Sequence, residues 1–323
     1  TRKESSAASD VYKRQILVTG GAGFLGARLI EALLTPAARD LLPEGGRIVS
    51  ADLAACPISD PRIESRTGDI SDPAFLASLV DADTRVIYHL AAIVSGQAEA
   101  DFDLGLRINF DATRALLEHC RQQGQVPRLV FASSLAVFGG PLPDRVPESL
   151  APLPQSSYGA QKAMAELLIN DYSRKGYVDG RVCRLPTISV RPGKPNAAAS
   201  SFASGMLREP LAGQASNCPV PLDTRLWLSS PGTVIANLLH AARLEGEALG
   251  QRRTLNLPGI SVRVSEMLDS LARVGGEAAL QRVSHEPDER VQRIVCSWPG
   301  DFDITRSLEL GFTADENFDA VIE

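Results

Sequence analysis

The segment TGGAGFLG, residues 19–26, lies between a short apolar run and a stretch in which leucines recur at helical spacing. The apolar run, residues 16–19, predicts a buried strand, and the leucines predict a helix that ends before Pro36. Gly20, Gly23 and Gly26 lie between the predicted strand and the predicted helix. They permit a tight turn in which the backbone can approach a phosphate at the helix N-terminus. This order of strand, glycine turn and helix predicts a fold that opens with a nucleotide-binding βα unit, with an ordinary glycine turn as the alternative.

Strands and helices alternate through the first 190 residues. Strand-like runs are expected at residues 47–51, 86–90, 129–132 and 181–185. Helices are expected between them, notably at residues 108–122 and 158–175. This alternation predicts an α/β fold, a Rossmann-like doubly wound parallel sheet with helices on both faces.

The pattern of residues along the chain changes near residue 190. The stretch RPGKPNAAAS is rich in turn residues, and short strands mixed with helices follow, for example at 231–243 and 264–274. We therefore expect a nucleotide-binding domain over residues 16–190 and mainly a smaller α/β substrate-binding cap over residues 191–323. Residues 1–15 are polar and precede the first strand abruptly, and we expect them to be a disordered, non-native tail.

Composition narrows the range of partners. The net charge is −6 and no basic stripe is present, which argues against nucleic acid. The five cysteines are widely spaced and form no CxxC pair, as expected for reduced thiols in the cytoplasm. No apolar run approaches the ~18 residues that a membrane helix needs, and the first residues lack the apolar core of a signal peptide. These features predict a cytoplasmic protein with a small-molecule ligand.

Asp52 closes the second predicted strand. A carboxylate at this place can accept hydrogen bonds from both ribose hydroxyls of an adenosine, and it would repel a 2′-phosphate. The following residues, LAACPISD, contain no arginine or lysine that could bind such a phosphate. NAD is therefore favoured over NADP, with a turn-capping Asp52 as the alternative interpretation.

Tyr158 and Lys162 stand four residues apart in YGAQK and so project from one face of a helix. A tyrosine hydroxyl has an ordinary pKa near 10, and a neighbouring ammonium group lowers it toward that of a usable base. The same lysine can hold the ribose next to the nicotinamide. An exposed helical pair is the alternative. Ser134 or its neighbour Ser133, at the end of the preceding strand, is placed to hydrogen-bond a substrate oxygen.

The histidines offer no second site. His89 ends an apolar strand and is predicted to be packed, and His119 and His240 stand alone on helices. His285 and Glu286 form a single pair of possible ligands, and no second pair completes a metal-binding motif, so no metal site is expected.

Together these motifs resemble the extended short-chain dehydrogenases, the group that includes sugar-nucleotide epimerases and dehydratases. The resemblance covers TGGAGFLG, Asp52, GDI, HLAA, FASSLAVFG, YxxxK with Glu166 after it, and LPT. It implies that the catalytic hydroxyl belongs to Ser134, four residues before Phe138, and that Asn109 supports the backbone of the active site. It further implies NAD contacts from Phe24, Leu25, Asp69, Ile70, Leu90, Ala91, Ala92, Pro186 and Thr187, beside the glycines, Asp52, Tyr158 and Lys162. A helix cap before Pro73 is the alternative role of Asp69.

Within this family, the second half of the chain resembles dehydrogenases of four-carbon aldonates. The resemblance implies oxidation of the C2 hydroxyl, with NAD as hydride acceptor. A carboxylate substrate needs cations, and Arg191 and Lys194 lie in the turn after the last predicted strand, with Arg225 further on. Ser95, Ser134 and Tyr158 complete the expected substrate contacts. Turn charges that only face solvent are the alternative for each cation.

Rival functions can be weighed on the same residues. A 4,6-dehydratase of this family usually carries an Asp-Glu pair after the catalytic hydroxyl, where this chain has Leu135 and Ala136. A sugar-nucleotide 4-epimerase needs only the Ser, Tyr and Lys and remains the main alternative. A non-enzymatic NAD sensor is a third possibility, although such proteins commonly lack the Tyr or the Lys. The resemblance also implies a homodimer that pairs through helices 108–122 and 158–175.

Overall fold

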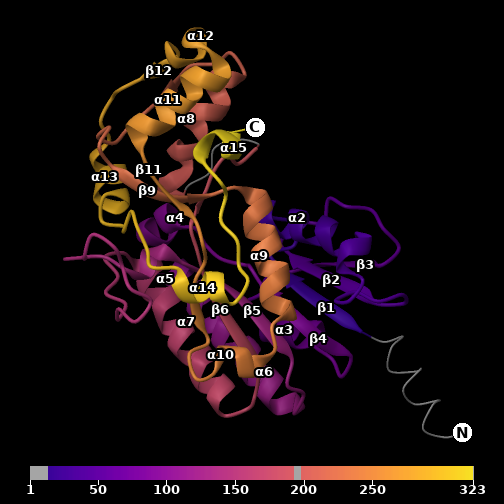
Figure 1. Cartoon of the computed structure of the whole chain (residues 1–323). Coiled ribbons are helices and arrows are strands. Elements are labelled where there is room, and N and C mark those ends of the chain that lie inside the picture. The colour runs from indigo at the N-terminus through magenta and orange to yellow at the C-terminus, as the bar shows by residue number, and fades with distance from the viewer. Residues whose placement is uncertain (1–13, 193–197, 323) are drawn as a thin grey trace, which may run out of the picture.

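A seven-stranded parallel sheet forms the centre of the molecule, in the order β10-β6-β5-β4-β1-β2-β3 (Figure 1). The computed structural model describes residues 14–192 and 198–322. The expected doubly wound sheet is confirmed. Its strands are β1 (Gln15–Thr19), β2 (Arg47–Asp52), β3 (Ile63–Thr67), β4 (Thr84–His89), β5 (Arg128–Ser134), β6 (Asp179–Leu185) and β10 (Thr254–Asn256).

The first strand begins one residue earlier than expected, because Gln15 belongs to it. Its side chain is buried and donates hydrogen bonds to Leu79 O and Thr84 Oγ1, both at 2.8 Å. Residues 1–13 lie outside the described part of the chain.

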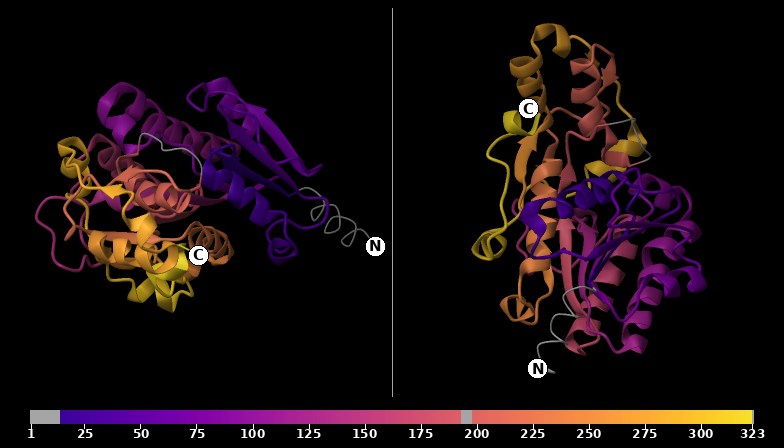
Figure 2. Two further views of the ribbon diagram at one scale, coloured as in Figure 1. Left: turned by 90° about the horizontal axis from the view of Figure 1, so that it is seen from above. Right: turned by 90° about the vertical axis from the view of Figure 1, so that its right-hand side faces the viewer.

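Helices cover both faces of the sheet (Figure 2). Strand residues alternate between the two faces: Ile16 and Val18 pack with one group of helices, and Leu17 packs with the other. The first group is α2 (Phe24–Leu33) and α9 (Pro231–Arg243), and the second is α3 (Pro73–Leu79), α6 (Ala112–Gln123) and α7 (Ser157–Arg174). The central strands β1, β4 and β5 are buried on both sides, which explains the apolar runs in their sequences, whereas the edge strand β3 is partly exposed.

The expected helix at 108–122 differs at its start. A π-helical turn, η2 (Arg107–Asp111), precedes α6, so the regular helix begins at Ala112. Two short helices, α4 (Ser95–Ala100) and α5 (Phe102–Leu106), lead into this turn from the end of β4. π-Helical turns within helices are frequent at functional sites, and this one carries the buried Asn109.

A cap stands over one end of the sheet, at the top of Figure 1. It has its own core, in which Met206, Leu207, Met267 and Leu271 are fully buried. Its strands form two small sheets, β7 (Thr187–Ile188) with β9 (Arg225–Ser229) and β11 (Ile260–Arg263), and β8 (Ser216–Asn217) with β12 (Val283–Ser284). Its helices are α8 (Phe202–Leu211), α11 (Val264–Gly275), α12 (Glu277–Leu280), α13 (Glu289–Val295) and α15 (Phe318–Ile322).

The chain beyond residue 190 does not stay in the cap. It returns to the main sheet with α9, α10 (Gly246–Leu249), the edge strand β10 and α14 (Thr305–Glu309). The second half of the sequence therefore builds both the cap and one side of the main domain. None of the helices in the described ranges combines the length and apolar character needed to span a bilayer.

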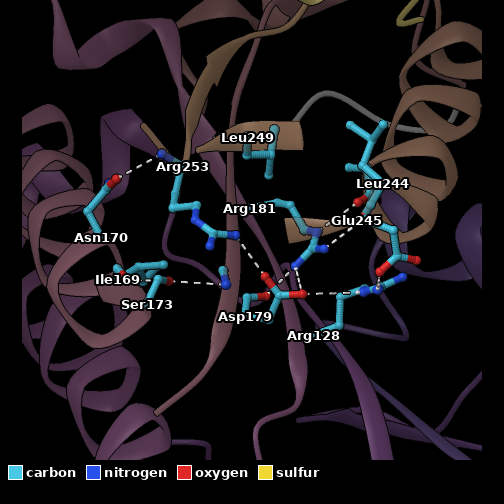
Figure 3. Close-up of polar contacts among 12 residues, drawn as sticks. Arg128, Ile169, Asn170, Ser173, Asp179, Arg181, Leu244, Glu245, Leu249 and Arg253 are labelled. Atoms are coloured by element: carbon cyan, nitrogen blue, oxygen red, sulfur yellow. Dashed lines mark hydrogen bonds and ion pairs between the residues drawn. The ribbon is translucent and has the colours of Figure 1, made fainter. Parts of the chain in front are cut away.

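Three arginines surround one carboxylate at the amino end of β6 (Figure 3). Asp179 pairs with Arg181 at 2.7 Å, Arg253 at 2.8 Å and Arg128 at 3.6 Å. The Arg181 side chain has no solvent exposure, and it also donates to Ala241 O, while Arg128 donates to Ala242 O. These carbonyls belong to the last turn of α9, so the cluster satisfies the C-terminus of the helix and fastens it to the sheet.

Asp179→Asn is therefore expected to lower the free energy of unfolding by about 2–4 kcal/mol, because it leaves the buried Arg181 without its counter-charge. Urea denaturation followed by circular dichroism measures the change. Asp171→Asn is the matched control, since the Asp171–Arg174 pair is exposed and should contribute less than about 1 kcal/mol. Equal losses in the two variants would contradict this role of the cluster.

Candidate functional site

The turn after β1 is built by backbone that comes too close for side chains. Gly20 has a φ of +73°, and a Cβ on it would lie 2.8 Å from Ala91 N. A Cβ on Gly26 would lie 2.0 Å from Gly20 O. The N-cap of α2, Gly23, has no side chain that could cap the first turn. The helix therefore presents its first amides to the turn, an arrangement suited to a pyrophosphate.

A cavity of about 360 Å³ adjoins this turn. Asp52 lies at the end of β2, where its carboxylate accepts from Ala22 N at 3.1 Å and from Ala54 N at 3.4 Å. It thus caps the turn and also faces the cavity, so the two interpretations of Asp52 are compatible. The predicted residues that line this cavity are Gly20, Gly23, Asp52, Asp69, Ile70, Leu90, Ala91 and Ala92, and motif spacing did not reveal Phe75, Gln97, Leu104 and Ile108.

Asp69 does not cap the following helix. That role belongs to Asp72, which accepts from Ala74 N at 2.9 Å. Asp69 instead accepts two hydrogen bonds from Ser71, and these hydrogen bonds hold the pKa of Asp69 below its usual value. Its carboxylate remains exposed at the rim of the cavity.

A second cavity, of about 220 Å³, lies where the sheet meets the cap. Leu90 and Ala92 line both cavities, so the two adjoin. The predicted residues on its wall are Leu25, Leu90, Ala92, Ser95, Ser134, Tyr158, Lys162, Pro186, Thr187 and Arg191. Val94, Ile188, Ser200 and Trp298 are further lining residues that the sequence patterns did not single out. The two adjoining cavities together offer room for a dinucleotide along the carboxyl ends of the strands.

Tyr158 and Lys162 come from the first turns of α7, whose N-cap Ser156 accepts from Gly159 N at 3.2 Å. Burial raises the pKa of Tyr158 to about 12, and a hydrogen bond with Ser134 acts in the opposite direction. Burial lowers the pKa of Lys162 to about 7, while the charge of Glu166 raises it. The Lys162 ammonium donates to Ala132 O at 2.9 Å and lies 5.8 Å from the centre of the Tyr158 ring.

The two adjacent serines differ in their partners. Ser133 donates a short hydrogen bond to Glu166, which forms a buried ion pair with Arg184 at 2.7 Å. The Ser134 hydroxyl accepts from Ala136 N at 3.1 Å and stays within reach of Tyr158. Of the two, Ser134 has the hydroxyl free to contact a substrate. The Ser133–Glu166–Arg184 network was not visible in the sequence, because its members come from three separate elements.

His89 is packed, as predicted. Its Nδ1 lies 2.7 Å from Thr19 Oγ1 and its Nε2 lies 2.9 Å from Thr113 Oγ1. Thr113 donates its own proton to Asn109 O, so His89 carries its hydrogen on Nε2 and accepts from Thr19 on Nδ1. Burial lowers the pKa of His89 to about 3, which keeps the ring neutral at physiological pH.

Arg191 lines the smaller cavity and also a hollow of about 180 Å³ next to the glycine turn. Within residues 14–192 and 198–322, no carboxylate pairs with its guanidinium. Burial and the nearby Arg208 lower the pKa of Arg191 from its usual value, so the site favours an incoming anion. Arg225 lies elsewhere, near Ser261 on β11, and Lys194 falls outside the described residues. The described part of the chain holds no cluster of metal-ligating residues.

The comparisons with known proteins agree with the fold. A model of the NAD dependent epimerase/dehydratase family matches residues 16–241. The chain therefore belongs to this family, and relatives named dehydrogenases identify it as an NAD-dependent oxidoreductase.

Several relatives match almost the whole chain. It is 55% identical to the D-erythronate dehydrogenase of Cupriavidus necator, over 95% of this chain and 96% of the relative. It is 50% identical to the D-erythronate dehydrogenase of Haemophilus influenzae, over 96% and 98%. A crystal structure from Agrobacterium tumefaciens, described as a nucleoside-diphosphate-sugar epimerase, matches with a TM-score of 0.88 and 43% identity, over 96% of this chain and 92% of that one.

The buried Lys162 predicts a pH-dependent stability. Its pKa of about 7 lies below the ordinary 10.5, so the unfolded chain binds more protons between these values and stability rises with pH there. Lys162→Met is expected to raise the Tm of the NAD-free protein by roughly 2–8 °C at pH 6–7, and by less at pH 9. Differential scanning fluorimetry measures both. Lys175→Met, at the exposed end of α7, should leave the Tm unchanged, and a gain that grew with pH would contradict the assignment.

Proposed function

We propose that this protein oxidises the C2 hydroxyl of D-erythronate to give 2-dehydro-D-erythronate, with NAD as the oxidant. One observation carries the proposal: a small cavity between the sheet and the cap brings Ser134, Tyr158 and Lys162 together with Arg191, whose guanidinium pairs with no carboxylate of residues 14–192 and 198–322. The arginine supplies the charge that a carboxylate requires. The two relatives named D-erythronate dehydrogenase support the same substrate.

The proposed catalytic residues act on one hydroxyl group. Tyr158, as the base, takes the C2 hydroxyl proton, and Ser134 hydrogen-bonds the same oxygen as it becomes a carbonyl. Lys162 favours the tyrosinate through its positive charge and binds the ribose beside the nicotinamide. NAD, when bound, supplies the hydride acceptor. Asn109 supports this arrangement from η2 without touching the substrate.

The proposed cofactor contacts follow the two cavities. Asp52 would bind the ribose of the adenosine, which favours NAD over NADP, and Asp69 and Ile70 would lie against the adenine. The phosphates would lie on the glycine turn at the N-terminus of α2. The remaining contacts would come from Phe24, Leu25, Leu90, Ala91, Ala92, Pro186 and Thr187.

Arg191 is the proposed ligand of the substrate carboxylate, with Ser95 beside it. The Ser95 hydroxyl already accepts from Ala199 N at 3.2 Å, so it also ties α4 to the segment that enters the cap. Lys194 remains a candidate from the sequence alone.

A sugar-nucleotide 4-epimerase is the second candidate, because the Agrobacterium structure carries an epimerase description at 43% identity. A groove of about 950 Å³ lies outside the smaller cavity and shares Ala198 with it, so a longer ligand has space there. An epimerase returns its hydride to the same substrate and accumulates no NADH. Accumulation of NADH therefore distinguishes a dehydrogenase from an epimerase.

Purified protein given D-erythronate and NAD is expected to accumulate NADH, measured by absorbance at 340 nm. Tyr158→Phe should lower kcat by at least ~100-fold, the usual effect of losing a general base, and should leave NAD affinity nearly unchanged. Interconversion of UDP-hexoses by protein that retains NAD, with no oxidation of the acid, would replace this function by the epimerase.

Arg191→Ala should raise the KM for the acid more than it lowers kcat, because the carboxylate contact contributes similarly to ground-state and transition-state binding. Arg225→Ala is the matched control, since Arg225 lies outside the cavity. Its kinetic constants should equal those of the unaltered protein. Equal effects of the two substitutions would remove Arg191 from the substrate site.

We also propose that the protein is a homodimer that pairs through α6 and α7. Leu167 and Met164 on α7 are 70% and 37% exposed, which is unusual for large apolar side chains on one helix face. Light scattering should give the mass of two chains, and Leu167→Glu should halve it. Leu308→Glu, on the exposed face of α14, should leave the mass unchanged. A single-chain mass for the unaltered protein would contradict the proposal.

A further inference from the structure

The loop between β4 and α4, residues 90–94, takes part in both halves of the cofactor site. Leu90 and Ala92 line both cavities, Val94 lines only the smaller one and Ile93 only the larger one. The backbone of Ala91 also lies directly against Gly20. A small displacement of this loop would therefore change the shape of the entire NAD site.

Buried hydrogen bonds hold the loop at two points. Ala91 N donates to Thr19 Oγ1 at 3.3 Å. Asn109 holds Ile93 from both sides, since its Oδ1 accepts from Ile93 N at 2.8 Å and its Nδ2 donates to Ile93 O at 3.1 Å. Through Asn109 O, the chain Thr113–His89–Thr19 connects these two points into one network.

A third contact reinforces the orientation of the Asn109 amide. Its second N–H donates to Gln161 Oε1 at 2.8 Å, which uses both donors of the amide. A rotated Asn109 amide would place donor against donor at Ile93 N and acceptor against acceptor at both Ile93 O and Gln161 Oε1. Gln161 thereby adds to the contacts of Ile93 and stabilises the one orientation in which Asn109 can hold the loop.

The nitrogen of the Gln161 amide lacks such a hydrogen-bond partner in the described part of the chain. This Nε2 atom is buried, and the residue is only 1% exposed. Gly105 leaves room for this amide group, because a Cβ there would lie 2.8 Å from Nε2. An unpaired buried donor lowers stability. An apolar side chain of the same length would remove this unpaired donor but leave one N–H of the buried Asn109 without its acceptor, so the two effects on stability would nearly cancel.

We propose that Gln161 is a positioning residue for NAD, which acts through Asn109 on residues 90–94. It precedes Lys162 on α7, so the contact also ties the cofactor loop to the helix that carries Tyr158 and Lys162. The role goes beyond the proposed oxidation of D-erythronate and requires only that the protein binds NAD.

Gln161→Met tests this role, because methionine matches the length of glutamine and cannot accept from Asn109. Isothermal titration calorimetry with NAD alone, without any hydroxy acid, is expected to show a Kd for NAD about tenfold higher than that of the unaltered protein. A tenfold change corresponds to the free energy of about one hydrogen bond. The Tm of the NAD-free variant should be close to that of the unaltered protein, because one unpaired buried donor replaces another. A merely structural glutamine would instead lower the Tm and leave the Kd unchanged.

Two further variants sharpen the test. Gln161→Glu keeps an acceptor oxygen toward Asn109 in either protonation state, so its Kd should stay within about threefold of the original. Asn170→Leu removes amide hydrogen bonds to Thr254 and Arg253 further along the same helix, and should lower the Tm without changing the Kd. An unchanged Kd in Gln161→Met, or equal increases in the Met and Glu variants, would overturn the proposal. Because no acid is present, neither result depends on the identity of the substrate.

Discussion

The contact between the backbones of Gly20 and Ala91 is the constraint on which the site depends. A Cβ at Gly20 would lie 2.8 Å from Ala91 N, so only glycine lets the turn after β1 lie against the loop after β4. The positive φ of Gly20 then directs the chain into α2. As a result, the first amides of α2, the carboxylate of Asp52 and residues 90–94 meet around one space. The parallel sheet contributes by ending β1, β2, β4 and β5 at the same edge.

Buried ionisable groups give this edge its chemistry, and they also lower its stability. Lys162 has a pKa of about 7 because it is removed from water, and burial raises the pKa of Tyr158 in the opposite sense. Both shifts favour the neutral forms of these two side chains. The charge of Glu166 partly offsets the effect on Lys162, and the ion pair with Arg184 keeps that carboxylate in place. Glu166, one helical turn from Lys162, and its partner Arg184 therefore form a second layer of charges that supports the reactive groups.

The cap and the main domain are joined by a chain that crosses between them several times. Thr187 and Ile188 of β7 pair with β9 in the cap directly after β6 leaves the main sheet. The chain later returns as α9 and β10, and the cluster around Asp179 fastens the end of α9 to the sheet (Figure 3). Near the end of the chain, Asp315 accepts from Ser229, Ser230 and Thr233 at the start of α9. The smaller cavity thus lies between two parts of the molecule that several long-range contacts hold in place.

The sequence by itself determined the strand, glycine turn and helix, the alternation that produces the parallel sheet, and the spacing of Tyr158 and Lys162. These features depend on local periodicity and on the steric properties of glycine, which neighbouring residues specify. Only the tertiary structure decided that the Ser133 hydroxyl bonds Glu166 while the Ser134 hydroxyl lies against Tyr158, that Trp298 reaches the cavity from the cap, and that Gln161 holds Asn109. It also decided that β10 pairs with β6, more than sixty residues earlier in the chain. Such contacts join residues far apart in the sequence, and their partners are chosen by packing and burial, which no local pattern of residues encodes.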